Sequence, residues 1–120
     1  MRIVISASGA TLDAAVDPRF GRAACFIAVD TESGVFEAHE NVQNLNAVQG
    51  AGIQAAETAA RLGAEAVLTG NCGPKAFKVL SAAEIPVYTG AQGTVAEAVA
   101  AFKAGRLRAT DAPNVEGHWA

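Results

Sequence analysis

The sequence predicts one α/β domain, and three observations lead to this prediction. The chain has 120 residues, a usual length for a single domain. Short apolar runs typical of strands occupy residues 1–40, and from residue 51 the apolar spacing becomes that of helices. Strands and helices then alternate, a pattern that favours parallel strands joined by right-handed crossovers.

The first 50 residues predict three strands, expected at residues 2–7, 24–30 and 35–40. The first of these is an apolar, β-branched run typical of a buried strand. Turn-forming residues are frequent at 8–22, which indicates a loop, and a turn at 31–34 joins the second and third strands into a hairpin. Residues 41–50 are rich in amides and have no period, so we expect an irregular loop there.

The remaining chain predicts helices that alternate with strands, expected as helix 51–63, strand 66–69, a helix from residue 74, strand 86–89 and helix 94–105. The apolar face of the first of these helices is expected at Ile53, Ala56, Ala60 and Gly63. Pro74 suits the first position of a helix, and Thr94 and Glu97 have the spacing of a capping box. The order is β-β-β-α-β-α-β-α, a domain over residues 1–107 followed by a tail over residues 108–120.

Charge and composition argue against several classes of protein. Nine Lys and Arg against twelve Asp and Glu give a net charge of −3, whereas proteins that bind nucleic acid usually present a basic face. The apolar runs are far shorter than the ~20 residues that span a bilayer, and the start of the chain lacks the pattern of a signal peptide. We therefore expect a cytoplasmic protein that binds neither nucleic acid nor membranes.

Cysteine and histidine spacing does not predict a metal site. Cys25 and Cys72 lie 47 positions apart, and no combination of Cys and His has the spacing of a zinc site. Both cysteines are expected to be free thiols in a reducing compartment. The sequence also shows no nucleophile–base pair, paired acids or phosphate-binding loop.

A short motif that is repeated in the chain predicts where a ligand could bind. Residues 66–80 and 86–100 both read as a strand, then Thr-Gly-x-x-Gly, then a helix. If the two strands are neighbours, two helix N-termini open side by side at the carboxyl edge of the sheet, and their unpaired N–H groups attract an anion. The alternative is that both motifs are ordinary turns in which glycine is needed for the backbone.

Cationic residues support the anion hypothesis. Arg19 and Arg22 flank Phe20 and Gly21 in the first loop, and Lys75 lies in the first turn of the second helix. Together they would create a local positive region on an acidic protein, although solvated surface cations are the alternative. Cys72 lies in the first motif, where the helix N-terminus is expected to lower its pKa. The candidate roles of Cys72 are a direct metal ligand, for which it is the only candidate, and a reactive thiol, while a small residue tolerated in a turn is the alternative.

Four ordered motifs resemble the dinitrogenase iron–molybdenum cofactor biosynthesis family, which includes NifX-type proteins and the C-terminal domain of NifB-type proteins. These motifs are Arg19-Phe20-Gly21-Arg22-Ala23, Gly50-Ala51-Gly52-Ile53-Gln54-Ala55-Ala56, Thr69-Gly70-Asn71-Cys72-Gly73-Pro74-Lys75-Ala76-Phe77 and Gly90-Ala91-Gln92-Gly93-Thr94-Val95. The resemblance covers residues 1–107. It implies a ribonuclease H-like, three-layer α/β/α fold with a mixed five-stranded sheet, non-enzymatic handling of metal–sulfur clusters, and a P-loop ATPase of the MinD/Mrp type as partner.

Within the family, the chain most resembles members that hold a mixed molybdenum–copper sulfide cluster without bonds from the protein to the metals. An iron–sulfur or iron–molybdenum precursor is the alternative cargo. Many relatives have histidine where this chain has Arg19 and Gln49, and an arginine suits an anion held by charge and hydrogen bonds. The expected binding residues are Arg19, Phe20, Gly21, Arg22, Gly70, Asn71, Cys72, Gly73, Lys75, Gly90, Ala91, Gln92, Gly93 and Thr94, with Phe20 excluding water.

Three other functions were compared with cluster binding. A nuclease of the ribonuclease H type needs an acid on the first strand to hold its metal ions, and residues 2–7 contain none. A nucleotide sensor would use the same helix N-termini, but nothing recognisable in the sequence reads a base or ribose. An interaction module for an ATPase, with no ligand of its own, stays open beside the carrier hypothesis.

Overall fold

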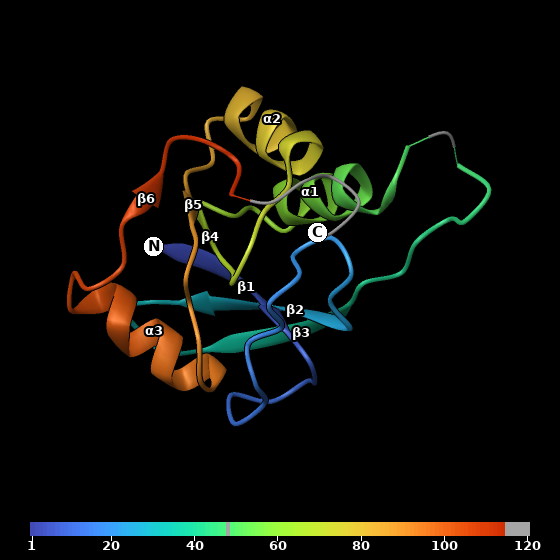
Figure 1. Ribbon diagram of the computed structural model, residues 1–120. Helices are drawn as coiled ribbons and strands as arrows, with labels where there is room; N and C mark the ends of the chain where they lie inside the picture. Colours follow the sequence, from blue (N-terminus) through green and yellow to red (C-terminus); the bar gives the residue numbers. More distant parts are fainter. Residues whose placement is uncertain (48, 115–120) are drawn as a thin grey trace.

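Six strands pair into one sheet in the computed structural model, which describes residues 1–47 and 49–114 (Figure 1). The elements are β1 (Arg2–Ala7), β2 (Cys25–Asp30), β3 (Phe36–Glu40), α1 (Ala51–Arg61), β4 (Ala66–Leu68), α2 (Pro74–Ala82), β5 (Val87–Tyr88), α3 (Val95–Lys103) and β6 (Ala109–Thr110). The order of helices and of the first five strands confirms the sequence prediction. None of the helices in these described ranges is long and apolar enough to cross a bilayer.

The sheet is mixed and its strands lie in the order β3-β2-β1-β4-β5-β6. β1 pairs antiparallel with β2, which forms the predicted hairpin with β3, and β1, β4 and β5 run parallel. The expected count of five strands is wrong, because β6 adds to β5 in antiparallel register. Two residues of the expected tail therefore belong to the sheet. The ribonuclease H-like classification and the boundary at residue 107 stay predictions, and residues 115–120 of the expected tail lie outside the described residues.

Helices cover both faces of the sheet. α1 and α2 lie together on one face, where Phe20, Phe26 and Leu80 are fully buried. α3 lies on the opposite face, where Leu68 and Val95 are fully buried (Figure 1). Although β4 and β5 are adjacent, the helices that follow them therefore diverge to opposite sides of the sheet.

Local sequence signals explain where the helices begin and end. The Thr94 hydroxyl accepts from the Glu97 N–H at 3.1 Å, and the Glu97 carboxylate accepts from the Thr94 N–H at 2.9 Å, which confirms the predicted capping box. Gly63 follows α1 with φ of +78°, a conformation that glycine adopts without a steric penalty. The predicted buried face of α1 is partly wrong, since Ala60 is exposed and Ala59 is buried.

Candidate functional site

The two Thr-Gly-x-x-Gly motifs lie side by side at the carboxyl edge of the sheet. Val67 pairs with Val87, so the offset of twenty in the sequence is also the register of the parallel strands. The Gly90 N–H donates to the Gly70 carbonyl at 2.9 Å, and the Ala91 N–H donates to a carbonyl of the neighbouring motif at 3.1 Å. The expectation that both motifs meet at one edge is confirmed.

The N-terminus of α3 is closed by the first long loop. The Val95 N–H donates to the Ala14 carbonyl and the Ala96 N–H donates to the Leu12 carbonyl, each at 2.9 Å. The Thr94 hydroxyl accepts the next N–H of the helix. All three donors that could have faced a ligand are thus satisfied within the chain, and the expectation of an open helix N-terminus in the second motif is wrong.

The N-terminus of α2 is open in the part of the chain that the structure describes. Its N-cap, Gly73, has no side-chain hydrogen bond, and Pro74 follows at the first helical position. The N–H groups of Lys75 and Ala76 have no hydrogen-bond partner among residues 1–47 and 49–114. Lys75 is exposed whereas Ala76 is buried against α1, so the positive end of this helix offers the Lys75 N–H to a ligand.

A second helix N-terminus, that of α1, lies against α2 and is open among the residues that the structure describes. Gly50 caps α1 without a side-chain hydrogen bond, and α1 packs along α2 (Figure 1). A Cβ atom on Gly52 would lie 3.3 Å from the Cβ of Ala76, so glycine permits the first turns of the two helices to touch. The repeated motif predicted a pair formed by α2 and α3, and the missed signal was the Gly-Ala-Gly run that opens α1.

The first loop is attached to the turn between β4 and α2, residues 69–73, which forms an elbow. The Phe20 N–H donates to the Asn71 carbonyl at 3.3 Å, and the Asn71 side-chain amide donates to the Pro18 carbonyl at 3.1 Å. A Cβ atom on Gly70 would lie 2.7 Å from the Cα of Pro18, a distance that real Cβ atoms do not reach. These contacts bring Arg19 beside the elbow, as the hypothesis required.

Phe20 does not line a surface. Its side chain is 0% exposed and its ring lies 5.4 Å from that of Phe26. The expectation that Phe20 excludes water from a bound cluster by contact is therefore wrong, and the ring instead anchors the first loop to the core beneath α1 and α2.

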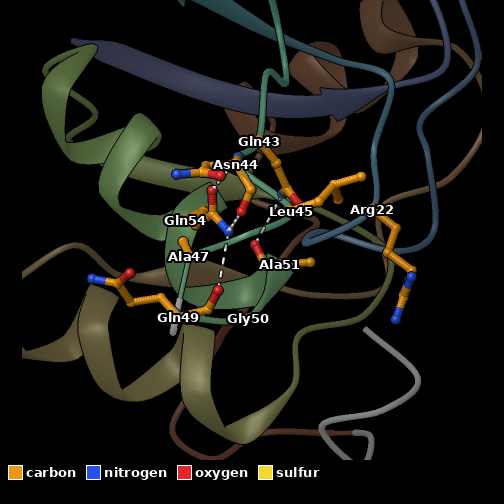
Figure 2. A pocket seen from close by; sticks show the side chains of 9 residues that line it. All are labelled: Arg22, Gln43, Asn44, Leu45, Ala47, Gln49, Gly50, Ala51 and Gln54. Carbon is orange, nitrogen blue, oxygen red and sulfur yellow. Dashed lines mark hydrogen bonds between the residues drawn. The ribbon is translucent and has the colours of Figure 1, made fainter.

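An open hollow of about 310 Å³ lies between the loop that precedes α1 and the start of α1, and Arg22 of the first loop also lines it (Figure 2). Its lining residues are Arg22, Gln43, Asn44, Leu45, Ala47, Gln49, Gly50, Ala51 and Gln54. The Gln43 amide donates to the Gly21 carbonyl at 2.8 Å and to the Ala51 carbonyl at 3.1 Å, which ties the two walls together. In Figure 2, Arg22 stands on the opposite side from Gln54.

The electrostatics of this region favour an anion. Arg22 is the one charged residue in the described lining of the hollow, and Arg19 and Lys75 are also exposed near the same sheet edge. The chain as a whole carries a net charge of −3. Cations gathered beside two helix N-termini therefore create a local positive potential on an acidic protein.

Cys72 is not available to a ligand. The residue is 0% exposed, its Sγ lies 3.7 Å from the Gly73 carbonyl, and burial raises the pKa of its thiol to about 12. The expectation of a lowered pKa is wrong, because removal of the thiolate from water outweighs the nearby helix N-terminus. Across residues 1–47 and 49–114, no three His, Cys, Asp or Glu side chains gather as a metal site.

Alkylation of the native protein is expected to leave Cys72 unmodified. At pH 8 a thiol with a pKa of about 12 is ionised to a fraction on the order of 10⁻⁴, and Cys72 is also buried. Treatment with iodoacetamide followed by peptide mass spectrometry should find label on the half-buried Cys25 and on Cys72 only after denaturation. Equal labelling of both cysteines in the folded protein would show that the elbow opens readily.

Comparison with known proteins shows the family. A family model described as dinitrogenase iron-molybdenum cofactor matches residues 1–105. The apo form of the orange protein from Desulfovibrio gigas is 43% identical, with a TM-score of 0.89 over 95% of this chain and 96% of that chain. A NifB-like protein from Thermotoga is 37% identical, with a TM-score of 0.80 over 97% and 98%. An uncharacterized protein from Methanocaldococcus jannaschii is 32% identical over 94 residues, which are 77% of this chain and 80% of the relative. The chain therefore belongs to the dinitrogenase iron–molybdenum cofactor family.

Proposed function

We propose that this protein is a non-enzymatic carrier that binds an anionic metal–sulfide cluster of the molybdenum–copper type without bonds from the protein to the metals. The observation that carries the proposal is the contact between two open helix N-termini, those of α1 and α2, beside the hollow that Arg22 lines. Family membership and the likeness to the orange protein support a cluster as cargo.

The chemistry of such a cargo matches the donors at this edge. Sulfides that carry negative charge accept hydrogen bonds from backbone N–H groups, and two helix dipoles together with exposed cations offset the charge. Arg19, Arg22 and Lys75 supply the cations, and the first turns of α1 and α2 supply the N–H groups. An arginine at position 19 favours charge pairing over direct coordination.

The proposed site is smaller than the sequence predicted. It keeps the half-buried Asn71 and the exposed residues Gly90, Gln92 and Gly93 at the neighbouring turn, and it adds the start of α1. The residues left out are Phe20, Gly21, Cys72, Gly73 and Ala91, which are buried, Thr94, whose N–H is bonded to Glu97, and Gly70, which is packed against the first loop. A buried residue offers no surface to a cluster, and the Cys72 N–H is in addition bonded to Asn114.

Reconstitution tests the function directly. Apo protein mixed anaerobically with tetrathiomolybdate and a copper(I) salt, then desalted, should keep molybdenum and copper by elemental analysis and show a visible absorption band. A colourless protein without molybdenum would reject the proposal. Elemental analysis of protein from its native source distinguishes this cargo from an iron-containing cluster. The ATPase partner and the cytoplasmic location stay predictions from the sequence.

Charge reversal at Arg22 is expected to weaken cluster binding about tenfold or more, because a cation beside the bound anion becomes a repelling carboxylate. Titration of Arg22→Glu with tetrathiomolybdate and copper(I) measures the loss. Arg106→Glu is the matched control, since Arg106 is exposed after α3 on the other side of the sheet and undergoes the same change of charge. Equal losses in both variants would show that net charge, and not the proposed site, governs binding.

A further inference from the structure

The chain after β6 returns to the elbow that precedes α2. β6 pairs with β5 at the edge of the sheet, and the Thr110 hydroxyl donates to the Ala112 carbonyl at 2.8 Å, which turns the chain. Asn114 then reaches Asn71 and Cys72, more than forty positions earlier in the sequence. The far end of the described chain thus lies at the N-terminus of α2.

Asn114 holds the elbow through three hydrogen bonds. The side-chain oxygen of Asn114 accepts from the Cys72 N–H at 2.8 Å, and the main-chain N–H of Asn114 donates to the Cys72 carbonyl at 3.1 Å. Its side-chain amide donates to the Asn71 side-chain oxygen at 3.0 Å. The side-chain nitrogen of Asn71 donates to the Pro18 carbonyl in the first loop. The two asparagines therefore connect the first loop, the elbow and the C-terminal segment.

Within the described residues, this contact is made by polar groups without an apolar anchor. Residues 111–114 are all exposed, so hydrogen bonds that compete with water hold the segment in place. The Asn114 oxygen is also an acceptor placed on an N–H group immediately before the open end of α2. An anionic ligand at this helix N-terminus would accept hydrogen bonds from the same kind of N–H donor.

We propose that residues 111–114 form a latch, in which the Asn114 side chain acts as an internal ligand that competes with the cluster for the elbow. The proposal rests on the proposed function, because the competing cargo is the anionic cluster. In the empty protein the latch covers the Cys72 N–H, and binding of the cluster displaces it. Removing the Asn114 amide therefore frees the elbow and tightens binding.

Titration of Asn114→Ala with tetrathiomolybdate and copper(I) tests the latch. The variant should bind about threefold to tenfold more tightly than the wild type, the range that a few exposed hydrogen bonds provide. Ala112→Ser is the matched control. It changes a side chain in the same segment, and Ala112 takes part in the turn through its main-chain carbonyl, which the substitution keeps. Its affinity should equal that of the wild type.

Amide exchange by NMR gives a second readout that needs no cluster. In the empty protein the Cys72 N–H should exchange faster in Asn114→Ala than in the wild type, and cluster binding to the wild type should shift the Asn114 side-chain resonances. Unchanged or weaker cluster binding by Asn114→Ala, with binding by the wild type intact, overturns the latch and leaves the carrier function standing. Failure of both proteins to bind overturns the carrier function and the latch with it.

Discussion

Replacing Phe20 with alanine is expected to lower the free energy of unfolding by about 3–5 kcal/mol, the usual cost of deleting a fully buried aromatic ring. The ring is 0% exposed and packs on Phe26, and the first loop has no other fully buried aromatic side chain among its described residues. Domains of this size have a total stability of about 5–15 kcal/mol, so the variant should be close to unfolding at physiological temperature.

Chemical denaturation of Phe20→Ala measures this loss, and Phe20→Leu separates the structural role from a binding role. Leucine keeps most of the buried apolar volume, so this variant should remain folded and bind the cluster within about twofold of the wild type. A folded Phe20→Leu protein that loses binding altogether would mean that the ring contacts the cargo, contrary to its position in the core.

Gly70→Ala is expected to cost about 3 kcal/mol, at the upper end of the range for forced overpacking. The added Cβ would lie 2.7 Å from the Cα and 3.0 Å from the carbonyl oxygen of Pro18. Both atoms belong to the main chain, so the clash cannot be relieved by rotating a side chain. The first loop must move away from the elbow, which takes Arg19 with it and weakens cluster binding.

The matched control is Gly90→Ala at the equivalent position of the second motif. Gly90 has φ of +81° with no atom near its would-be Cβ, so alanine costs about 1–2 kcal/mol through the left-handed backbone alone. Denaturation curves compare the stabilities, and exchange of the Phe20 N–H, which bonds to Asn71, reports the position of the loop. Fast exchange is expected in Gly70→Ala only. Slow exchange in both variants would contradict the proposed movement of the loop.

Local signals in the sequence were sufficient to predict most of the fold. The repeat of Thr69-Gly70 at Thr89-Gly90 predicted neighbouring strands, because equal spacing from strand to turn fits one parallel register. The Thr94–Glu97 capping box needs only four consecutive residues and was also confirmed. β6 escaped prediction because two residues are too few to show an alternating pattern.

The arrangement of the site depended on tertiary contacts that no local pattern records. The two motifs look alike, but the helices that follow them pack on opposite faces of the sheet. Carbonyl groups of residues 12–14 then close α3, and they do so only because the first loop passes over it. The burial of Cys72 has the same origin, since α1 and α2 enclose the elbow from one side.

The divergence of α2 and α3 makes the molecule one-sided as a carrier. On the side of α3 the chain satisfies its own donors, so substitutions there should alter folding without altering the exchange of cargo. Under the proposed function, a protein that delivers or receives the cluster would have to approach over the first turns of α1 and α2. Donor and acceptor proteins would therefore have to dock on the same face of the sheet, one after the other.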